Sequence, residues 1–133
     1  MNLVQKISSC FIFPALVLAG HLIATKGLAL YAIFPNLDMP FHFIGGVSIG
    51  YTTIKVLGFL QSENLIARID KTILLLLLFT TTATAAVFWE FMEFTTDWML
   101  GTNIQVSLAN TMQDQFLGIL GGSLVLIAAR KAP

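Results

Sequence analysis

Four long apolar stretches constrain this chain more than any other feature of its sequence. They cover residues 9–34, 41–60, 73–94 and 114–129. A transmembrane helix needs about 20 mainly apolar residues. The last stretch is the shortest, and we expect it to extend back toward Leu108. Polar connections, one of which holds Pro35 and Pro40, interrupt the helices between the stretches. The pattern therefore predicts about four membrane-spanning helices.

The composition supports the same interpretation. Of the 133 residues, 56% are hydrophobic and 11% are charged, whereas soluble domains carry about 25% charged residues. Too little polar surface is available to cover a water-soluble globule. We therefore predict an all-α, polytopic membrane protein in which residues 1–133 form a single transmembrane helical bundle. The first apolar stretch is longer than the core of a signal peptide, so we expect it to be retained.

The basic residues predict how the helices are oriented. Lys6 precedes the first stretch, Arg68 and Lys71 lie between the second and third, and Arg130 and Lys131 follow the last. The other two connections contain no Lys or Arg. Because basic residues favour the cytoplasmic side of a membrane, we expect both termini and the middle connection to be cytoplasmic.

Most of the acidic residues gather at the opposite, outer level. Five of the seven acids fall there: Asp38, Glu90, Glu93, Asp97 and Asp114. Glu90, Glu93 and Asp97 are spaced three and four residues apart, which places them on one face of a helix. Asp38 and His42 are four residues apart at the outer start of the second stretch. Ionisable groups at membrane depth are costly, so these residues indicate a functional site.

Carboxylates combined with an imidazole are ligands that suit Mg²⁺, Mn²⁺, Zn²⁺ or ferrous iron. We predict His42, Glu93 and Asp114 as metal ligands. Glu90 is predicted as an acid–base group, and Asp38 as the group that orients His42. A metal ion there would activate water or polarise a phosphoryl or carbonyl group.

Two further polar residues lie at a similar depth. Lys26 is in the outer half of the first stretch, where it could pair with an acid or an anionic substrate. Asp97 lies one helical turn beyond Glu93.

Structural roles remain open for most of these residues. Asp38 suits a turn at a helix start, and Asp114 suits the N-terminal dipole of its helix. His42 can have a local interfacial partner, and Glu93 and Asp97 can simply be hydrated at the boundary. Glu90 is the hardest to explain in this way, because it lies nearly a full turn inside the span. For His21, alone in the middle of the first stretch, we favour an interhelical hydrogen bond over a ligand role.

Small residues predict where the helices approach one another. Two glycine pairs have a four-residue spacing: Gly46 with Gly50, and Gly118 with Gly122. Such pairs allow close contact between helix backbones. We therefore expect the last three spans to pack tightly, which would draw the acids together. The aromatic residues Tyr31, Trp89 and Trp98 fit an outer interfacial belt.

Three segments in a fixed order resemble a known family. They are residues 38–46 (DMPFHFIGG), 88–94 (FWEFMEF) and 110–114 (NTMQD). Together they resemble the YjdF-like group of bacterial inner-membrane proteins and, more distantly, the VanZ-like group. The resemblance covers roughly residues 38–122. It implies a bacterial inner-membrane location and a shared site formed by Asp38, His42, Glu90, Glu93 and Asp114.

The chain departs from that family at one position. Asn110 stands where the family usually has an Asp, so the expected site has one negative charge fewer. The family has no established reaction, so the resemblance supports the positions of the site residues and not a particular reaction.

Three functions fit these features, and the sequence leaves open whether the protein is an enzyme. The first is metal-assisted chemistry on a lipid head group or another envelope substrate. The second is a cation- or proton-coupled transporter or binding protein, which the scarcity of polar groups in the inner halves of the spans disfavours. The third is a non-catalytic assembly subunit with a membrane-protein or homo-oligomeric partner. Membrane lipids are expected partners, and a formal net charge of zero gives no attraction to nucleic acid.

Overall fold

The structure, a computed structural model, describes residues 2–28 and 30–130, which are helical apart from the connections. The elements in chain order are α1 (Leu3–Cys10), α2 (Ile12–Leu22), the π-helix η1 (Ile23–Gly27), α3 (Leu30–Ile33), the 3₁₀ turn η2 (Pro35–Leu37), α4 (Asp38–Ser62), α5 (Lys71–Leu100) and α6 (Leu108–Arg130). The all-helical prediction is therefore confirmed for the described residues.

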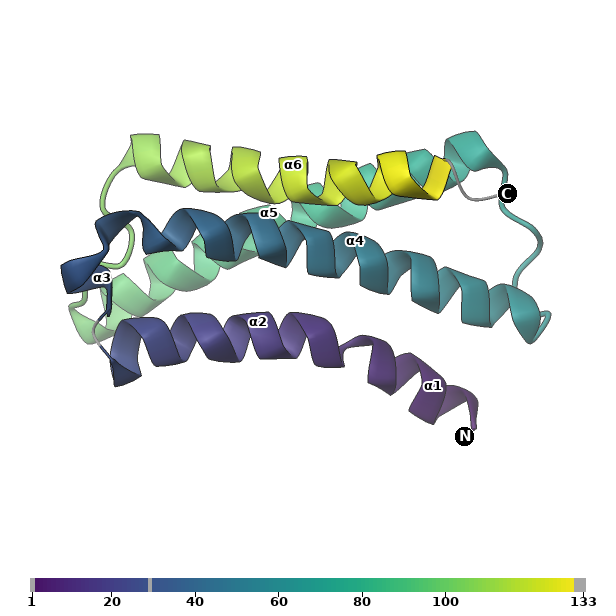
Figure 1. Cartoon of the computed structure of the whole chain (residues 1–133), viewed down its shortest axis with the longest axis horizontal. Helices are drawn as coiled ribbons and strands as arrows, with labels where there is room; N and C mark the ends of the chain where they lie inside the picture. The colour runs from purple at the N-terminus through teal and green to yellow at the C-terminus, as the bar shows by residue number, and fades with distance from the viewer. Residues whose placement is uncertain (1, 29, 131–133) are drawn as a thin grey trace.

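The helices lie side by side along one long axis (Figure 1). Helix α4 packs most extensively on α6, both contact α5, and α2 lies along α4. The two chain ends lie at one end of the bundle, whereas α3 and the α5–α6 connection lie at the other (Figure 1). Residues from α2, α4, α5 and α6 can therefore meet at the end that carries α3.

Three segments are long and apolar enough to cross a membrane: Leu3–Thr25, Asp38–Ser62 and Lys71–Leu100. The second and third contain the stretches predicted over residues 41–60 and 73–94. The first begins and ends earlier than the stretch predicted over residues 9–34. The chain already becomes helical at Leu3, because Asn2 and Gln5 cap that helix reciprocally. Its later residues form the separate short helix α3.

Glycines set the close approach of α4 to α6. A Cβ atom on Gly46 would overlap the carbonyl oxygen of Gly118, and one on Gly121 would overlap that of Phe43. Only glycine allows the two backbones to lie this close. The prediction of tight packing is confirmed for these two helices.

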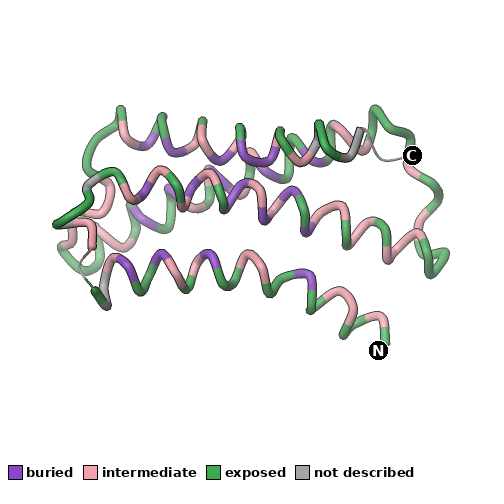
Figure 2. The backbone as a smooth tube through the Cα atoms, viewed as in Figure 1, coloured by how far each residue is buried: buried purple, intermediate pink, exposed green. Residues whose placement is uncertain are grey.

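The polarity of the bundle is inverted relative to a soluble protein. Polar and charged residues outnumber apolar ones among the buried side chains, and buried positions follow the inward faces of α4, α5 and α6 (Figure 2). Large apolar side chains such as Phe116 and Leu124 are exposed. This arrangement suits a lipid environment, in which an outward apolar surface has no cost.

Candidate metal centre

Six ionisable side chains from four helices converge near the α3 end of the bundle. This polar cluster comprises His21 from α2, Asp38 and His42 from α4, Glu90 and Glu93 from α5, and Asp114 from α6. Each residue is at most 5% exposed. Buried charges require partners, protons or a metal ion, so the partners of each group determine what the cluster can do.

His42 lies among three carboxylates. Its Nε2 is 3.4 Å from Asp38 Oδ1, 3.7 Å from Glu90 Oε1 and 3.7 Å from Glu93 Oε1. Hydrogen bonds from nitrogen to oxygen are about 2.7–3.2 Å long. The carboxylates therefore surround this nitrogen at distances that leave it without a hydrogen-bond partner.

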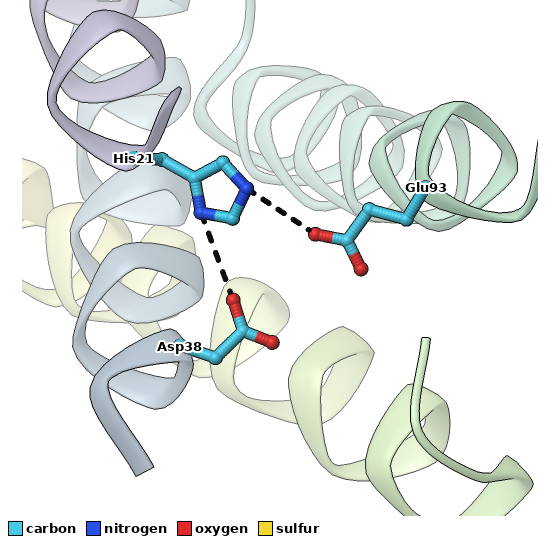
Figure 3. Close-up of side chains that lie close together, drawn as sticks. All are labelled: His21, Asp38 and Glu93. Carbon is cyan, nitrogen blue, oxygen red and sulfur yellow. Dashed lines mark ion pairs between the residues drawn. The ribbon is translucent and has the colours of Figure 1, made fainter. Parts of the chain in front are cut away.

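His21 lies between two carboxylates from different helices (Figure 3). Its Nδ1 is 3.7 Å from Asp38 Oδ1, and its Nε2 is 3.6 Å from Glu93 Oε1. The Tyr31 hydroxyl is 2.9 Å from both His21 Nδ1 and Asp38 Oδ1, and it donates its single hydrogen to Asp38. Nδ1 is then the donor toward the Tyr31 oxygen, so a neutral His21 ring carries its lone pair on Nε2, facing Glu93.

Tyr31 is suited to that donor role. It lies in α3, beyond the first apolar segment. Burial raises the pKa of its hydroxyl, and the adjacent Asp38 carboxylate raises the pKa further. The hydroxyl therefore stays protonated and fixes one oxygen of Asp38.

Trp89 contacts both imidazoles. Its ring centroid is 5.1 Å from that of His21 and 5.1 Å from that of His42. Its indole Nε1 donates to Glu93 Oε1 over 2.8 Å. Trp89 therefore contacts the polar cluster directly.

Glu90 and Asp114 are each held through one oxygen only. Gln105 Nε2 donates to Glu90 Oε2 over 3.2 Å, and Asn110 Nδ2 donates to Asp114 Oδ2 over 2.6 Å. The second oxygens, Glu90 Oε1 and Asp114 Oδ1, are buried without a hydrogen-bond partner, as is His42 Nε2. Leaving a buried polar atom unsatisfied costs about 1–3 kcal/mol. Three such atoms in one cluster are available to bind a further group.

The geometry permits metal coordination by three overlapping sets of ligands. They are His21 with Asp38 and Glu93, Asp38 with His42 and Asp114, and His42 with Glu90 and Glu93. Within each set the ligand atoms lie within 4.8 Å of one another. The residues can therefore hold an ion, and their oxygen and imidazole donors suit Mg²⁺, Mn²⁺, Zn²⁺ or ferrous iron.

The structure brings together five of the seven residues predicted for the site: Asp38, His42, Glu90, Glu93 and Asp114. Asp97 lies apart from the described ligand sets. Its carboxylate accepts hydrogen bonds from Thr102 Oγ1 over 2.6 Å and from the N–H groups of Ile104 and Gln105 over 2.8 Å each. Asp97 thereby shapes the connection that presents Gln105 to Glu90. The side chain of Lys26 lies outside the described residues.

Two residues of the site were not predicted from the sequence. His21 was expected to make a hydrogen bond, and it does so with Tyr31, but it also faces Asp38 and Glu93. Tyr31 was assigned to an aromatic belt, whereas its hydroxyl reaches the cluster. Hydropathy gives no signal that the chain leaves the axis of the first span before Tyr31. A mid-span histidine, in contrast, is itself a signal of function.

The helices and the polar cluster together define an integral membrane protein. The chain belongs to the family described as "Predicted membrane protein (DUF2238)", whose family model matches residues 4–132. The narrower resemblance to the YjdF-like group remains a prediction. No curated protein matches the chain, and no solved structure does.

Proposed function

We propose that the polar cluster binds a divalent metal ion and that the protein uses this ion for chemistry on a lipid head group. One observation carries the proposal: His42 Nε2, Glu90 Oε1 and Asp114 Oδ1 are buried ligand atoms without hydrogen-bond partners, and they come from three different helices. His42 belongs to two of the ligand sets, one with Glu90 and Glu93 and one with Asp38 and Asp114. An ion in either set would give a partner to His42 and to one of the two carboxylates. It would also reduce the repulsion between carboxylates that lie this close.

The surrounding hydrogen bonds support the same function. Metal ligands are commonly oriented by outer partners that hold their other atoms. Gln105 holds the second oxygen of Glu90, and Asn110 holds that of Asp114. The Asn110 amide provides a donor that the Asp expected from the family resemblance would lack at neutral pH.

The role proposed for Asp38 differs from the one expected from the sequence. Asp38 approaches Nε2 of His42, which is the nitrogen without a hydrogen-bond partner. A carboxylate at that nitrogen can share the ion as a ligand. In this arrangement Asp38, His42, Glu93 and Asp114 supply ligands. Glu90 supplies a ligand or an acid–base group close to the reacting water.

We further propose that α6 is a fourth span and that the cluster lies in the outer leaflet of a bacterial inner membrane. The two chain ends share one end of the bundle (Figure 1). Lys6 Nζ forms a 2.8 Å ion pair with Glu63 Oε1 in the middle connection, at that same end. Basic residues at this end favour the cytoplasm. The cluster, at the other end, would then lie near the lipid head groups.

Elemental analysis of the detergent-purified protein tests the metal site. We expect near-stoichiometric divalent metal in the wild type and its loss in Glu90→Gln. The loss of affinity should exceed the roughly 10–100-fold cost of removing an outer-shell partner. Glu63→Gln is the matched control, because it removes an acid outside the cluster and should leave the metal content unchanged.

Metal-free wild-type protein, after purification without chelators and addition of Zn²⁺ or Mn²⁺, would contradict the proposal. Protons or the basic residues of a partner would then balance the acids. That result would place proton-coupled transport or membrane assembly ahead of metal chemistry.

A further inference from the structure

An apolar cavity of about 370 Å³ lies between α2, α4 and α5, directly beside the polar cluster. This tail cavity has walls of Leu18 from α2, Gly45 and Ile49 from α4, and Ala85 and Phe88 from α5, among others. Its volume falls within the roughly 300–1,000 Å³ of small-molecule sites. Its walls are suited to a hydrocarbon rather than a polar ligand.

Small residues create the space. Gly45 on α4 and Ala85 on α5 line the cavity. A Cβ atom on Gly45 would already contact the Trp89 ring at 3.6 Å. The small side chains at Gly45 and Ala85 therefore leave room for the cavity.

The cavity opens sideways from the bundle. Helix α2 packs on α4 and not extensively on α5. The apolar residues Phe88, Met92 and Phe11 line the cavity and are 61%, 56% and 52% exposed. In a membrane, this opening between α2 and α5 faces the lipid chains rather than water.

Two residues connect the cavity to the polar cluster. His42 and Trp89 line the cavity, and both also contact the cluster, His42 through Nε2 and Trp89 through its bond to Glu93. A chain-like molecule in the cavity would therefore place one end at the candidate metal ligands.

We propose that the tail cavity binds one hydrocarbon chain of a membrane lipid whose head group lies at the polar cluster. This inference rests on the proposed function and narrows its substrate class to lipids that enter from the bilayer. A helix of another protein, about 10–12 Å across with its side chains, is too wide for the space. An extended acyl chain suits the apolar walls, the lateral opening and the polar end.

Photolabelling of the full chain in lipid vesicles tests the inference. The probe is a phosphatidylethanolamine with a diazirine midway along one acyl chain, diluted into phosphatidylethanolamine and phosphatidylglycerol. Peptide mapping should find labels on cavity residues such as Ala85 and Ile49. Outward residues of α6, such as Phe116 and Leu124, report ordinary surrounding lipid and serve as the internal reference.

Ala85 lines the cavity and is not a member of the polar cluster, so Ala85→Leu is the variant that fills the cavity. We expect it to lower cavity labelling, relative to α6, by about tenfold, because the added side chain displaces roughly two methylene groups of the bound chain. Ala83→Leu is the matched control on the same helix, since Ala83 does not line the cavity, and it should leave the ratio unchanged.

Equal labelling ratios in the wild type and Ala85→Leu would overturn the inference. Metal content, measured on the same samples, separates this failure from failure of the metal site. Retained metal with equal ratios contradicts the tail cavity alone. Absent metal with a ratio that falls in Ala85→Leu supports lipid binding and contradicts the metal centre.

Discussion

The contact between Gly46 and Gly118 allows a stability prediction to be worked out from the structure. In Gly46→Ala, the new Cβ atom would lie 2.7 Å from the Gly118 carbonyl carbon, whereas carbon atoms in contact are about 3.5–4.0 Å apart. Helices α4 and α6 must then separate by roughly 1 Å, and overpacking of this kind costs about 1–3 kcal/mol.

Gly58→Ala is the matched control for this substitution. Gly58 lies in the same helix, and a Cβ atom there would meet nothing within 4 Å. Both variants gain the same helix propensity, about 0.8–1 kcal/mol. The difference in their free energies of unfolding therefore isolates the cost of the steric clash. We expect Gly46→Ala to have a free energy of unfolding about 1–3 kcal/mol below that of Gly58→Ala.

Unfolding in mixed detergent micelles, followed by circular dichroism during titration with dodecyl sulfate, measures this difference. Metal affinity gives a second readout. Gly46 lies one helical turn after His42, so separation of α4 from α6 moves His42 away from Asp114. Equal stability of the two variants would refute the assigned α4–α6 contact. Reduced stability with unchanged metal affinity would refute the coupling between packing and the site.

Three other outcomes follow from single contacts. The Thr72 N–H holds the pKa of Asp70 below its ordinary value of 3.8, so Asp70→Ala should lower stability at neutral pH. This deficit should begin to shrink as the pH falls below 3.8 and disappear once the pH is below the lowered pKa of Asp70 in the folded protein, because protonation then removes the same contribution from the wild type; a deficit that persists in that range would contradict it. Tyr31→Phe removes a donor to Asp38 and should weaken metal binding by roughly 10–100-fold in a competition titration, whereas an unchanged affinity would exclude an outer-shell role. Asp97→Ala should speed proteolysis between α5 and α6, and an unchanged cleavage rate would show that its bonds do not hold that connection.

The sequence predicted the helical class and most of the polar cluster for two physical reasons. Acids at helical spacing must share a face, and alternating spans return successive helix ends to the same level. Those two rules are sufficient to bring Glu90, Glu93 and Asp114 near Asp38 and His42.

The remaining features depend on how the chain turns between spans. Hydropathy merges α2, η1 and α3 into one apolar stretch, so it cannot show that α3 returns Tyr31 toward Asp38. By its spacing, Asp97 should lie on the same face of α5 as Glu90 and Glu93. Its carboxylate nevertheless bonds to the following connection, where nearby backbone N–H groups are available. The hydrogen-bond partner of a carboxylate depends on the tertiary structure, and the periodicity of the sequence alone does not determine it.

The connection that carries Gln105 has a kinetic consequence. Gln105 bonds Glu90 from the end of the bundle, and the cluster residues are almost entirely inaccessible to water. With the aqueous side covered in this way, a lipid substrate of the proposed reaction would arrive through the lateral opening between α2 and α5. Turnover would then follow the mole fraction of the substrate within the bilayer rather than its bulk concentration. Diluting the substrate with inert lipid would slow the reaction even when the total amount of substrate stays constant.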